Sequence, residues 1–498
     1  MIGRLPRPGL RQTGIVVIIL FLGGLAACGG GSHSQPPPPG GGGGGGGGGG
    51  SAVAPFFFGM HINNPNSTFP STTPSPNVPI AGVRLWDTQT SWATTNISPI
   101  PAGSSSNCPP SSCDWTNLDL RVNQALAKKV DVLYDFARTP AWAQCANNNP
   151  LCGSANTTIT CAYATIPPPE GGPGECFPPN DLNFDGSGTN QHWIDWVTAV
   201  VTRYKGKISY YEIWNEPNNT AMWQGTNAQL VRLAGDARCI IVGDKGCNPT
   251  ISSYSQTGID PSAKVLTPGW GNPIDSIGPY LITPLNGVVG VTGASLADIA
   301  AFHGYPGRNP PEQVLKIYGT LSGLLQGLNL PVFDTEGSWG ASNGIPSISD
   351  PDQQAAFTAR YLLVQQSAGI QRLYWYGWDL ASGAGTLWTP SGGLTLAGVA
   401  YQQTELWVSG ATLVKPPGCS ANGSIWTCAY TRSGNYQALA VWDASQSCSG
   451  GVCGSSTFTL PSSPAFTQYQ DLAGNTHAVS GTVAIGAKAI LIETGNIP

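Results

Sequence analysis

Two glutamates stand at the ends of strand-like runs and could act as a pair. Residues 207–218 read KISYYEIWNEPN, where aromatic and β-branched residues favour a strand that the proline ends. Glu216 therefore stands at the carboxyl end of that strand, beside the Asn215 amide. Residues 331–340, PVFDTEGSWG, repeat this arrangement with Glu336, 120 residues further along the chain. Two carboxylates on two strand ends are the groups that cleave a glycosidic bond.

Alternating strand-like and helix-like runs surround these glutamates between residue 55 and about residue 410. The strand candidates cover residues 55–60, 81–87, 130–142, 207–218, 264–270, 299–307, 331–336 and 372–379. The helix candidates cover residues 117–129, 191–204, 227–242, 275–286, 311–328, 351–369 and 395–409. Alternating β and α units imply a parallel sheet, and eight of them predict an α/β fold of the (β/α)8 TIM barrel type. In such a barrel the reacting residues lie at the C-terminal ends of the strands.

An open, doubly wound sheet is the alternative arrangement of the same units. That fold normally carries a Gly-rich phosphate loop after its first strand. The segment GMHINNPN, which follows the first strand candidate, does not resemble such a loop, and the Gly tract at 40–50 precedes every strand. The barrel is therefore the preferred prediction.

The rest of the folded part is irregular or β-rich. Two insertions, 88–113 and 143–189, are rich in Pro, Ser, Asn and Cys and follow strand ends. Loops this long are usually functional or disordered, and paired cysteines argue against disorder, so we expect them to wall part of a cleft. Residues 411–498 contain short β-rich runs broken by turns, which predicts a small C-terminal antiparallel β-sandwich domain.

The composition argues against nucleic acid as a partner. Charged residues make up only 10% of the 498 residues, and the formal net charge is −5. Loss of the three arginines in the N-terminal segment would leave 19 basic and 27 acidic residues, a charge of about −8. Phosphate contacts need clustered Lys and Arg, and a mildly acidic protein without a basic patch is a poor nucleic-acid binder. We expect a carbohydrate substrate, no nucleic acid, and a monomer.

The N-terminus has the features of a targeting signal. Three arginines precede an apolar run from Ile15 to Leu25, which is too short to span a membrane comfortably. The run ends in Leu-Ala-Ala-Cys28, which resembles a bacterial lipoprotein processing site with Cys28 as the lipidated residue; an ordinary signal peptide is the alternative. Residues 29–54, Pro- and Gly-rich, predict a disordered tether. We thus expect a protein of the bacterial cell envelope, facing the periplasm or the exterior.

The cysteines support export. Of the 13, setting Cys28 aside leaves six sequence-local pairs. These are Cys108/Cys113, Cys145/Cys152, Cys161/Cys176, Cys239/Cys247, Cys419/Cys428 and Cys448/Cys453. Short-loop disulfides formed in an oxidising compartment are the simplest account. A metal site is the alternative, but the sequence has no CxxC pair and no HxxxH spacing.

Several motifs together resemble a known group of enzymes. WNEPN on the fourth predicted strand, HGYP on the sixth and TEGSW on the seventh resemble the retaining glycoside hydrolases of clan A. With VRLWD and DFARTPAW, the set is most similar to glycoside hydrolase family 39, with family 5 a near neighbour. The resemblance covers residues 55 to about 410 and extends toward the trailing β-domain. It implies a retaining hydrolase of β-glycosidic bonds that needs no metal or organic cofactor.

The resemblance implies roles for the two glutamates. Glu216 matches the acid/base, and Glu336 matches the nucleophile that forms a covalent glycosyl-enzyme. Glu336 must then be ionised while Glu216 holds a proton, and a neighbouring negative charge raises one pKa of such a pair. Strand alternation would put Trp214 on the inner face with Glu216, so the pleat must break if Asn215 is to reach the sugar's 2-hydroxyl.

Other residues are candidates for supporting roles. Arg84 is either a structural arginine or, as we expect from the cost of burying an unpaired charge, a partner of Glu336. His303 and Tyr305 share a strand face; His303 is either a core histidine or a partner of Glu216, with Tyr305 bonded to Glu336.

Three further residues are weaker candidates. Trp378 matches the sugar-stacking aromatic of the resembled enzymes, although Trp is also a common core residue, and Trp339 is a weaker candidate of the same kind. Arg138 either binds a substrate hydroxyl or braces the third strand.

Two rival interpretations belong to other classes. The first is a non-catalytic polysaccharide-binding surface lipoprotein on a barrel scaffold, whose signature would be loss of one glutamate; both glutamates are present. The second is an esterase, which needs a Ser/His/Asp set and a GxSxG elbow. The few histidines of the sequence have no obvious serine partner.

Overall fold

The computed structural model describes most of the chain from Ala52 onward. The described residues are 52–53, 55–64, 69–70, 78–145, 161, 175–307, 309–339, 348–380, 385–414 and 418–497. The predicted signal segment, Cys28, most of the tether, and Cys152 lie outside them. Within the described ranges, none of the helices combines the length and apolarity that crossing a membrane requires.

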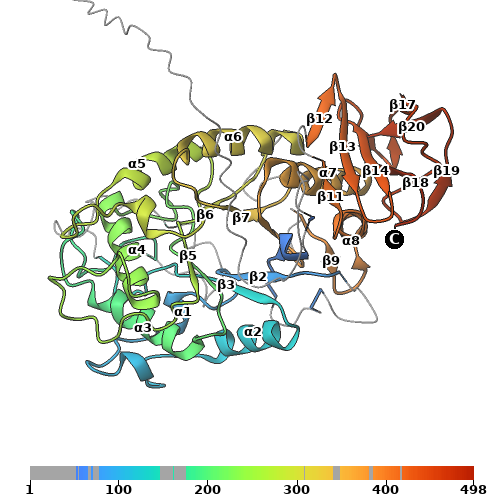
Figure 1. Ribbon diagram of the computed structural model, residues 1–498. Helices are drawn as coiled ribbons and strands as arrows, with labels where there is room; N and C mark the ends of the chain where they lie inside the picture. The colour runs from blue at the N-terminus through green and yellow to red at the C-terminus, as the bar shows by residue number, and fades with distance from the viewer. Residues whose placement is uncertain are drawn as a thin grey trace, which may run out of the picture. The chain divides into compact units, whose positions relative to one another are not determined.

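Eight parallel strands form a closed barrel, which confirms the predicted (β/α)8 fold (Figure 1). They are β1 (Phe58–Met60), β2 (Gly82–Leu85), β3 (Asp131–Asp135), β4 (Tyr210–Glu212), β5 (Lys264–Leu266), β6 (Ala300–Phe302), β7 (Val332–Gly337) and β8 (Arg372–Trp375). The order around the sheet is β5-β4-β3-β2-β1-β8-β7-β6. Parallel bridges from Leu266 to Ile299 and from Trp270 to Phe302 close it between β5 and β6. An open, doubly wound sheet is therefore excluded.

Helices connect the strands and cover the barrel. They are α1 (Trp92–Thr95), α2 (Thr116–Ala127), α3 (Gln191–Tyr204), α4 (Asn227–Ile241), α5 (Ile277–Ile282), α6 (Val314–Leu324), α7 (Pro351–Ala368) and α8 (Leu396–Val408). Local sequence sets their ends. Thr226 and Gln229 form a capping box that starts α4. Asp350 caps α7, and Gly369, with φ 85°, ends it.

The barrel interior is layered. An apolar layer that includes Leu133, Ala301, Phe333 and Tyr374 fills the middle. Below it, at the N-terminal ends of the strands, the Arg372 guanidinium lies 3.9 Å from the centroid of the Phe56 ring. The apolar layer separates this end from the charged groups at the C-terminal end, where both glutamates lie.

The C-terminal segment forms the predicted antiparallel β-domain. Its main sheet has the order β11-β13-β14-β21-β18-β19, with β12 paired to β13. The strands are β11 (Thr412–Leu413), β12 (Cys419–Asn422), β13 (Ile425–Thr431), β14 (Gln437–Asp443), β18 (Gln468–Gln470), β19 (Thr476–Ala478) and β21 (Ile490–Glu493). The pair β17 (Ser455–Thr459) and β20 (Thr482–Gly486) packs through Val483 and Ile485 against Val441 and Ile492 of the main sheet.

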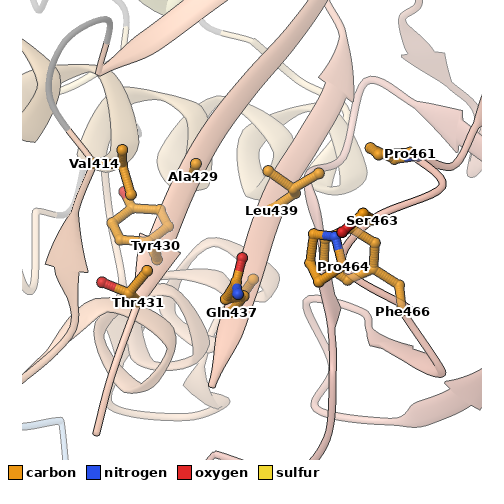
Figure 2. Close-up of a pocket in the computed structure, with 11 residues that line it drawn as sticks. Val414, Ala429, Tyr430, Thr431, Gln437, Leu439, Pro461, Ser463, Pro464 and Phe466 are labelled. Carbon is orange, nitrogen blue, oxygen red and sulfur yellow. The ribbon is translucent and has the colours of Figure 1, made fainter. Parts of the chain in front are cut away.

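Two short hairpins and a cavity lie outside the barrel and the main sheet of the β-domain. The hairpins are β9 (Trp388–Thr389) with β10 (Gly393–Leu394), and β15 (Cys448–Ser449) with β16 (Val452–Cys453). A cavity of about 270 Å³ lies in the β-domain (Figure 2), between β13, β14 and the segment from Pro461 to Phe466. None of the site residues predicted from the sequence lines it.

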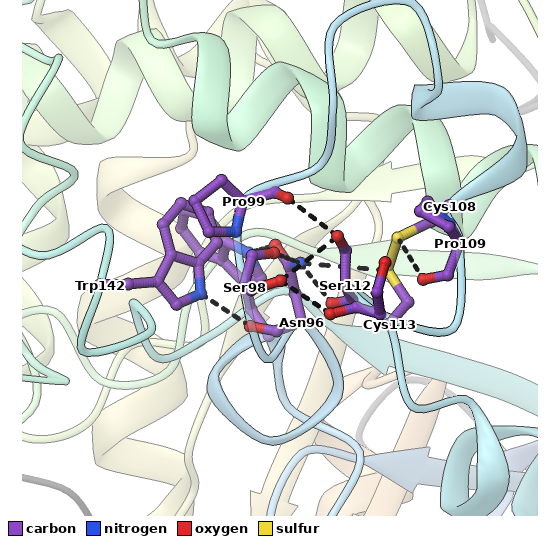
Figure 3. Close-up of a disulfide and its surroundings, with 10 residues drawn as sticks. Asn96, Ser98, Pro99, Cys108, Pro109, Ser112, Cys113 and Trp142 are labelled. Carbon is purple, nitrogen blue, oxygen red and sulfur yellow. Dashed lines mark hydrogen bonds between the residues drawn. A yellow bond between two sulfur atoms is a disulfide. The ribbon is translucent and has the colours of Figure 1, made fainter.

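Five of the six predicted disulfides form between described residues: Cys108–Cys113, Cys161–Cys176, Cys239–Cys247, Cys419–Cys428 and Cys448–Cys453. Figure 3 shows how the first is anchored in the 88–113 insertion. Asn96 Nδ2 donates to the Ser112 carbonyl at 2.9 Å, and Trp142 Nε1 donates to the Asn96 carbonyl at 2.9 Å. This insertion is therefore an ordered loop fixed to the segment after β3. Much of the second insertion, 146–160 and 162–174, lies outside the described residues.

Candidate active site

The chain leaves its strand path immediately after β4. Trp214 has φ 85° and Glu216 has φ 43°, both in the left-handed region that costs a non-glycine residue about 1–3 kcal/mol. The turn sends the Trp214 ring outward, where it packs 4.7 Å from the Trp223 ring centroid and donates from Nε1 to the Met222 carbonyl. Strict strand alternation predicted that Trp214 would share the inner face with Glu216, and the structure shows that it does not. The side chain of Asn215 turns inward instead.

The two glutamates meet at the C-terminal end of the barrel. One oxygen of Glu216, one oxygen of Glu336 and a ring nitrogen of His303 all lie within 4.8 Å of one another. Glu336 is 7% exposed, and the side chain of Glu216 is 20% exposed. Carboxyl groups about 5–5.5 Å apart suit a double displacement, whereas an inverting reaction needs about 6.5–9.5 Å. The distance between these two oxygens is therefore closer to the spacing of a double displacement than to that of an inverting reaction.

A buried arginine organises the acidic groups. Arg84 is fully buried and donates to Glu212 Oε2 (2.6 Å), Glu336 Oε2 (2.8 Å), Asp135 Oδ2 (2.9 Å) and Asn215 Oδ1 (2.8 Å). The structure thus places Arg84 beside Glu336, as the sequence argument expected. A hydrogen-bonded guanidinium fixes the carboxylate geometry and favours its charged form.

His303 links the two glutamates from β6. Its Nδ1 lies 2.9 Å from Glu216 Oε1 and 4.0 Å from Glu336 Oε2. Burial lowers the pKa of His303, but the charges of Glu336 and Glu216 outweigh it, so the pKa of His303 is raised overall. The imidazolium form, which donates Nδ1–H to Glu216, is therefore favoured. Tyr305, two residues later, donates its hydroxyl to Glu336 Oε1 at 2.9 Å.

The pKa directions of the glutamates differ from the sequence expectation. Burial raises the pKa of Glu336, with His303 and Arg84 acting against the rise. Burial also raises that of Glu216, but the hydrogen bond and charge of His303 reverse the effect, and the pKa of Glu216 is lowered. The directions of the two shifts therefore favour the proton on His303 over Glu216. Transfer along the 2.9 Å hydrogen bond between them would give Glu216 its acid form.

The structure does not bring the two tryptophans to the site. Trp378 is fully buried, and Trp388 stacks on it with ring centroids 6.0 Å apart and planes 3° apart. Trp339 is also fully buried and donates from Nε1 to Thr358 Oγ1 at 3.0 Å. Sugar stacking needs an accessible ring face, so the sugar-stacking expectation for Trp378 and Trp339 is corrected: both are packing residues.

Arg138 lies near the site but does not contact either glutamate in the described part of the chain. It is fully buried, with φ 70°, and its Nη1 is 4.0 Å from Glu175 Oε2. Its guanidinium lies 5.2 Å from the centroid of the Trp86 ring. This position favours the bracing role over direct contact with a sugar hydroxyl.

Sequence reasoning missed a group of polar residues that follow β1, β2 and β8. Asn63 Nδ2 and the Tyr376 hydroxyl both donate to Asp87 Oδ2. His61 lies below the two glutamates, where its Nε2 donates to the Thr335 carbonyl of β7 at 3.0 Å. The available signal was positional, because each residue stands just past the end of a strand, the edge at which barrel sites form.

Glu216, His303 and Glu336 are also donor types that bind divalent metals. A metal would have to displace the His303 proton and compete with the Arg84 guanidinium, which lies 2.8 Å from Glu336. The arrangement therefore suits acid–base chemistry better than metal binding.

Comparisons with known proteins agree on the architecture. No protein-family model matches the chain, and no curated protein sequence matches it. Among solved structures, a family 39 glycoside hydrolase from Bacteroides cellulosilyticus WH2 aligns with a TM-score of 0.54 at 12% identity, over 83% of this chain and 75% of its own. The GH39 enzyme from Xanthomonas axonopodis pv. citri aligns at 0.53 and 14% identity, over 89% and 95%.

A monomeric β-xylosidase from Caulobacter crescentus CB15 aligns with a TM-score of 0.52 at 14% identity, over 89% of this chain and 97% of its own. At such identities the likeness is one of fold. This chain therefore shares the fold of clan A glycoside hydrolases along most of its length.

Proposed function

We propose that this protein is a retaining glycoside hydrolase that cleaves β-glycosidic bonds in a poly- or oligosaccharide. The observation that carries the proposal is the approach of Glu216 and Glu336, with carboxylate oxygens within 4.8 Å at the C-terminal ends of β4 and β7. The shared fold with structures described as family 39 enzymes and a β-xylosidase supports it.

The reaction proceeds by two displacements. In the first, Glu336 attacks the anomeric carbon while Glu216 transfers its proton to the departing glycosidic oxygen, which leaves as an alcohol. In the second, Glu216 takes a proton from water, whose oxygen attacks the same carbon and releases Glu336 as a carboxylate. Two inversions retain the configuration.

The surrounding residues position the nucleophile. Arg84 and Tyr305 each donate to one Glu336 oxygen, at 2.8 and 2.9 Å, and so hold the carboxylate in one orientation. The Asn215 Oδ1 accepts from Arg84, which leaves the Asn215 NH2 group to donate to the sugar's 2-hydroxyl. Such a bond strengthens in the transition state and adds to rate.

Two isosteric variants test the roles. Glu336→Gln should lose at least about 1,000-fold in kcat on all β-glycosides, because the nucleophile is gone. Glu216→Gln should lose as much on alkyl glycosides, yet retain glycosylation of dinitrophenyl glycosides, whose leaving group needs no proton. The substrate panel should include aryl β-glycosides, xylan, β-glucan, mannan and an acidic exopolysaccharide, with product configuration read by NMR.

The control is the unfolding temperature of each variant, which should match the wild type within a few degrees. Inverted products, or a Glu336→Gln enzyme with near-wild-type turnover, would reject the double displacement. Glycan binding without release of reducing ends would favour the polysaccharide-binding alternative.

We also propose that the protein is a monomer, lipid-anchored through Cys28, in the bacterial cell envelope. The apolar segment before Cys28 and the local disulfides of the folded part support this location. Radiolabelled palmitate should enter the wild type but not a Cys28→Ser variant, which should be recovered in the aqueous phase of a detergent partition. Equal labelling of both proteins would reject the anchor.

A further inference from the structure

Three polar side chains form a compact group on one side of Glu336. We call Asn63, Asp87 and Tyr376 the Asp87 cluster; they follow β1, β2 and β8, which are adjacent in the order β2-β1-β8-β7. Glu336 lies on β7, at the end of this sector. Burial is the main cause of the raised Glu336 pKa, and the Asp87 charge adds to it, so the cluster lies within electrostatic reach of the nucleophile.

Each donor group of the cluster already has an acceptor. Asn63 Nδ2 and the Tyr376 hydroxyl both donate to the same oxygen, Asp87 Oδ2, the latter at 2.7 Å. Only an N–H can face a carboxylate oxygen, so the Asn63 amide is oriented with its carbonyl away from Asp87. The atoms that remain are acceptors: within the described residues, Asp87 Oδ1 and Asn63 Oδ1 are enclosed and have no hydrogen-bond partner.

A third acceptor lies beside the cluster. The fully buried His61 donates from Nε2 to the Thr335 carbonyl at 3.0 Å, which fixes Nδ1 as the unprotonated nitrogen. Burial holds the pKa of His61 well below its usual range, so the ring stays neutral. Nδ1 also has no partner in the described part of the chain. The centroid of the His61 ring is 4.9 Å from the centroid of the Tyr376 ring.

The cluster is held in place before any ligand arrives. Asp379, in the segment after β8, accepts the backbone N–H groups of Asn63 and Asn64 at 2.8 and 2.9 Å. These two bonds tie the segment after β1 to the segment after β8. A recognition site needs such fixed positions, because each ångström of misplacement weakens its hydrogen bonds.

Enclosed acceptors without donors are costly, and a ligand that brings donors removes the cost. Sugar hydroxyls are such donors. A carboxylate or sulfate brings only acceptors, and it would add a negative charge next to Asp87 and Glu336. Both effects favour a ligand that donates hydrogen bonds and carries no negative charge.

We propose that the Asp87 cluster binds the hydroxyls of the sugar attacked by Glu336, and that it selects a neutral glycoside over a uronide. Asp87 Oδ1 and Asn63 Oδ1 accept from two hydroxyls of the same ring. This proposal rests on the proposed function and names the substrate class of the same site.

A double-mutant cycle between protein and substrate tests the assignment. The measurement is kcat/KM of the purified wild type and of Asp87→Ala and Asn63→Ala on an aryl β-glycoside and its monodeoxy analogues. For the hydroxyl that Asp87 accepts, deletion should cost the wild type roughly 10- to 100-fold and the Asp87→Ala enzyme less than about threefold. The matched control, exposed Asp114→Asn, should keep the wild-type ratios.

A second comparison addresses charge. The wild type should prefer the aryl β-glucoside over the β-glucuronide, and Asp87→Asn should narrow that preference at least about tenfold. Equal losses on every analogue, with unchanged ratios, would assign Asp87 a purely positioning role and overturn the proposal. If the variants fail to fold, the monodeoxy analogues are tested on the wild type alone. The proposal would also be overturned if removal of each hydroxyl left kcat/KM of the wild type unchanged. A wild type inactive on all β-glycosides would instead reject the proposed function.

Discussion

At the residue scale, Arg84 faces more negative charge than one cation can neutralise. It contacts Asp135, Glu212 and Glu336 in a region closed to solvent. Burial raises the pKa of Asp135 well above its usual range despite Arg84, and the Glu212 and Glu336 charges add to the rise. Burial therefore favours the neutral form of Asp135, which can still accept a hydrogen bond from Arg84.

Asp135→Asn should therefore have little effect on activity, because an amide has the shape of a protonated carboxyl and the same carbonyl acceptor. We expect kcat/KM within about threefold of the wild type. Glu212→Gln should cost roughly 10- to 100-fold, since it removes a charged partner 2.6 Å from Arg84. Steady-state kinetics on one aryl glycoside measures both. Equal losses in the two variants would contradict the proton on Asp135.

The pH dependence of activity is a second prediction at this scale. Burial raises the pKa of Glu336 above 4.5, and activity should be lost as falling pH protonates it. The pKa of His303 is raised above 6.5 by Glu336 and Glu216 against the opposing effect of burial, so the proton shared with Glu216 should be lost only at higher pH. A plot of kcat/KM against pH should be bell-shaped.

The matched variant is His303→Ala. Without the imidazole, the proton must reside on Glu216 alone, so the alkaline limb should move to lower pH by at least about one unit. An alkaline limb that stays in place would show that another group sets it.

At the element scale, one carboxylate joins β6, β7 and α7. Asp334 Oδ1 accepts from the Gly304 N–H at 3.0 Å, and Oδ2 accepts from the Tyr361 hydroxyl at 2.8 Å and from Gln365. Burial raises the pKa of Asp334 to about 7, against these hydrogen bonds. The strand that carries Glu336 is therefore attached to its helix through a group that prefers to be neutral.

This link predicts a stability effect. The folded state holds a proton on Asp334 between pH 3.8 and about 7, where the unfolded chain does not, so stability should fall as pH rises through that window. Asp334→Asn should flatten this decline in the unfolding temperature by several degrees, while Asp114→Asn should not. If the unfolding temperature of the Asp334→Asn variant depends on pH in the same way as that of the wild type across this window, the raised pKa of Asp334 would be contradicted.

The spacing of apolar residues predicted an element well where those residues form its buried face. The expected helix 191–204 matches α3 at both ends, since its apolar residues recur at helical spacing. The expected strand 130–142 is too long, because the chain leaves the sheet after Asp135 and the later apolar residues pack in a loop. Glu216 and Glu336 were found because each stands within a recognisable local motif.

Features that are assembled from distant segments of the chain could not be predicted from the sequence. Asn63, Asp87 and Tyr376 meet only when the barrel closes, and none has a local pattern that marks it. The burial of Trp378 depends on stacking with Trp388, a contact that no spacing in the sequence specifies.

At the scale of the whole molecule, the β-domain completes the barrel's exterior. All residues of α7 from Thr358 to Gln366 are buried, so the helix is covered on every side rather than on one face. The Tyr430 hydroxyl bonds Gln366 Oε1 at 3.1 Å, Trp442 Nε1 bonds Glu312 Oε1 at 2.7 Å, and Ala356 packs with Cys448 and Ala487. We therefore expect the barrel and the β-domain to unfold together.

A truncation after residue 410 should therefore fail to give a stable barrel. Removal of the β-domain exposes α7 and removes the hydrogen bonds that Tyr430 and Trp442 donate to the barrel, which should cost several kcal/mol. Calorimetry should show a single unfolding transition for the intact protein, and the truncated chain should be recovered as aggregate. Two separate transitions, or a soluble and active barrel, would contradict a single unit.

The chain joins the fold at a defined place. Ala52 pairs with Thr412, and Val53 donates to the Ala411 carbonyl at 2.6 Å, just past the C-terminus of α8 and before the start of β1. Helices of this barrel end, and strands begin, on the side away from Glu216 and Glu336. A ligand that approaches the opposite opening therefore meets Glu216 and Glu336 without passing the point where the chain enters the fold.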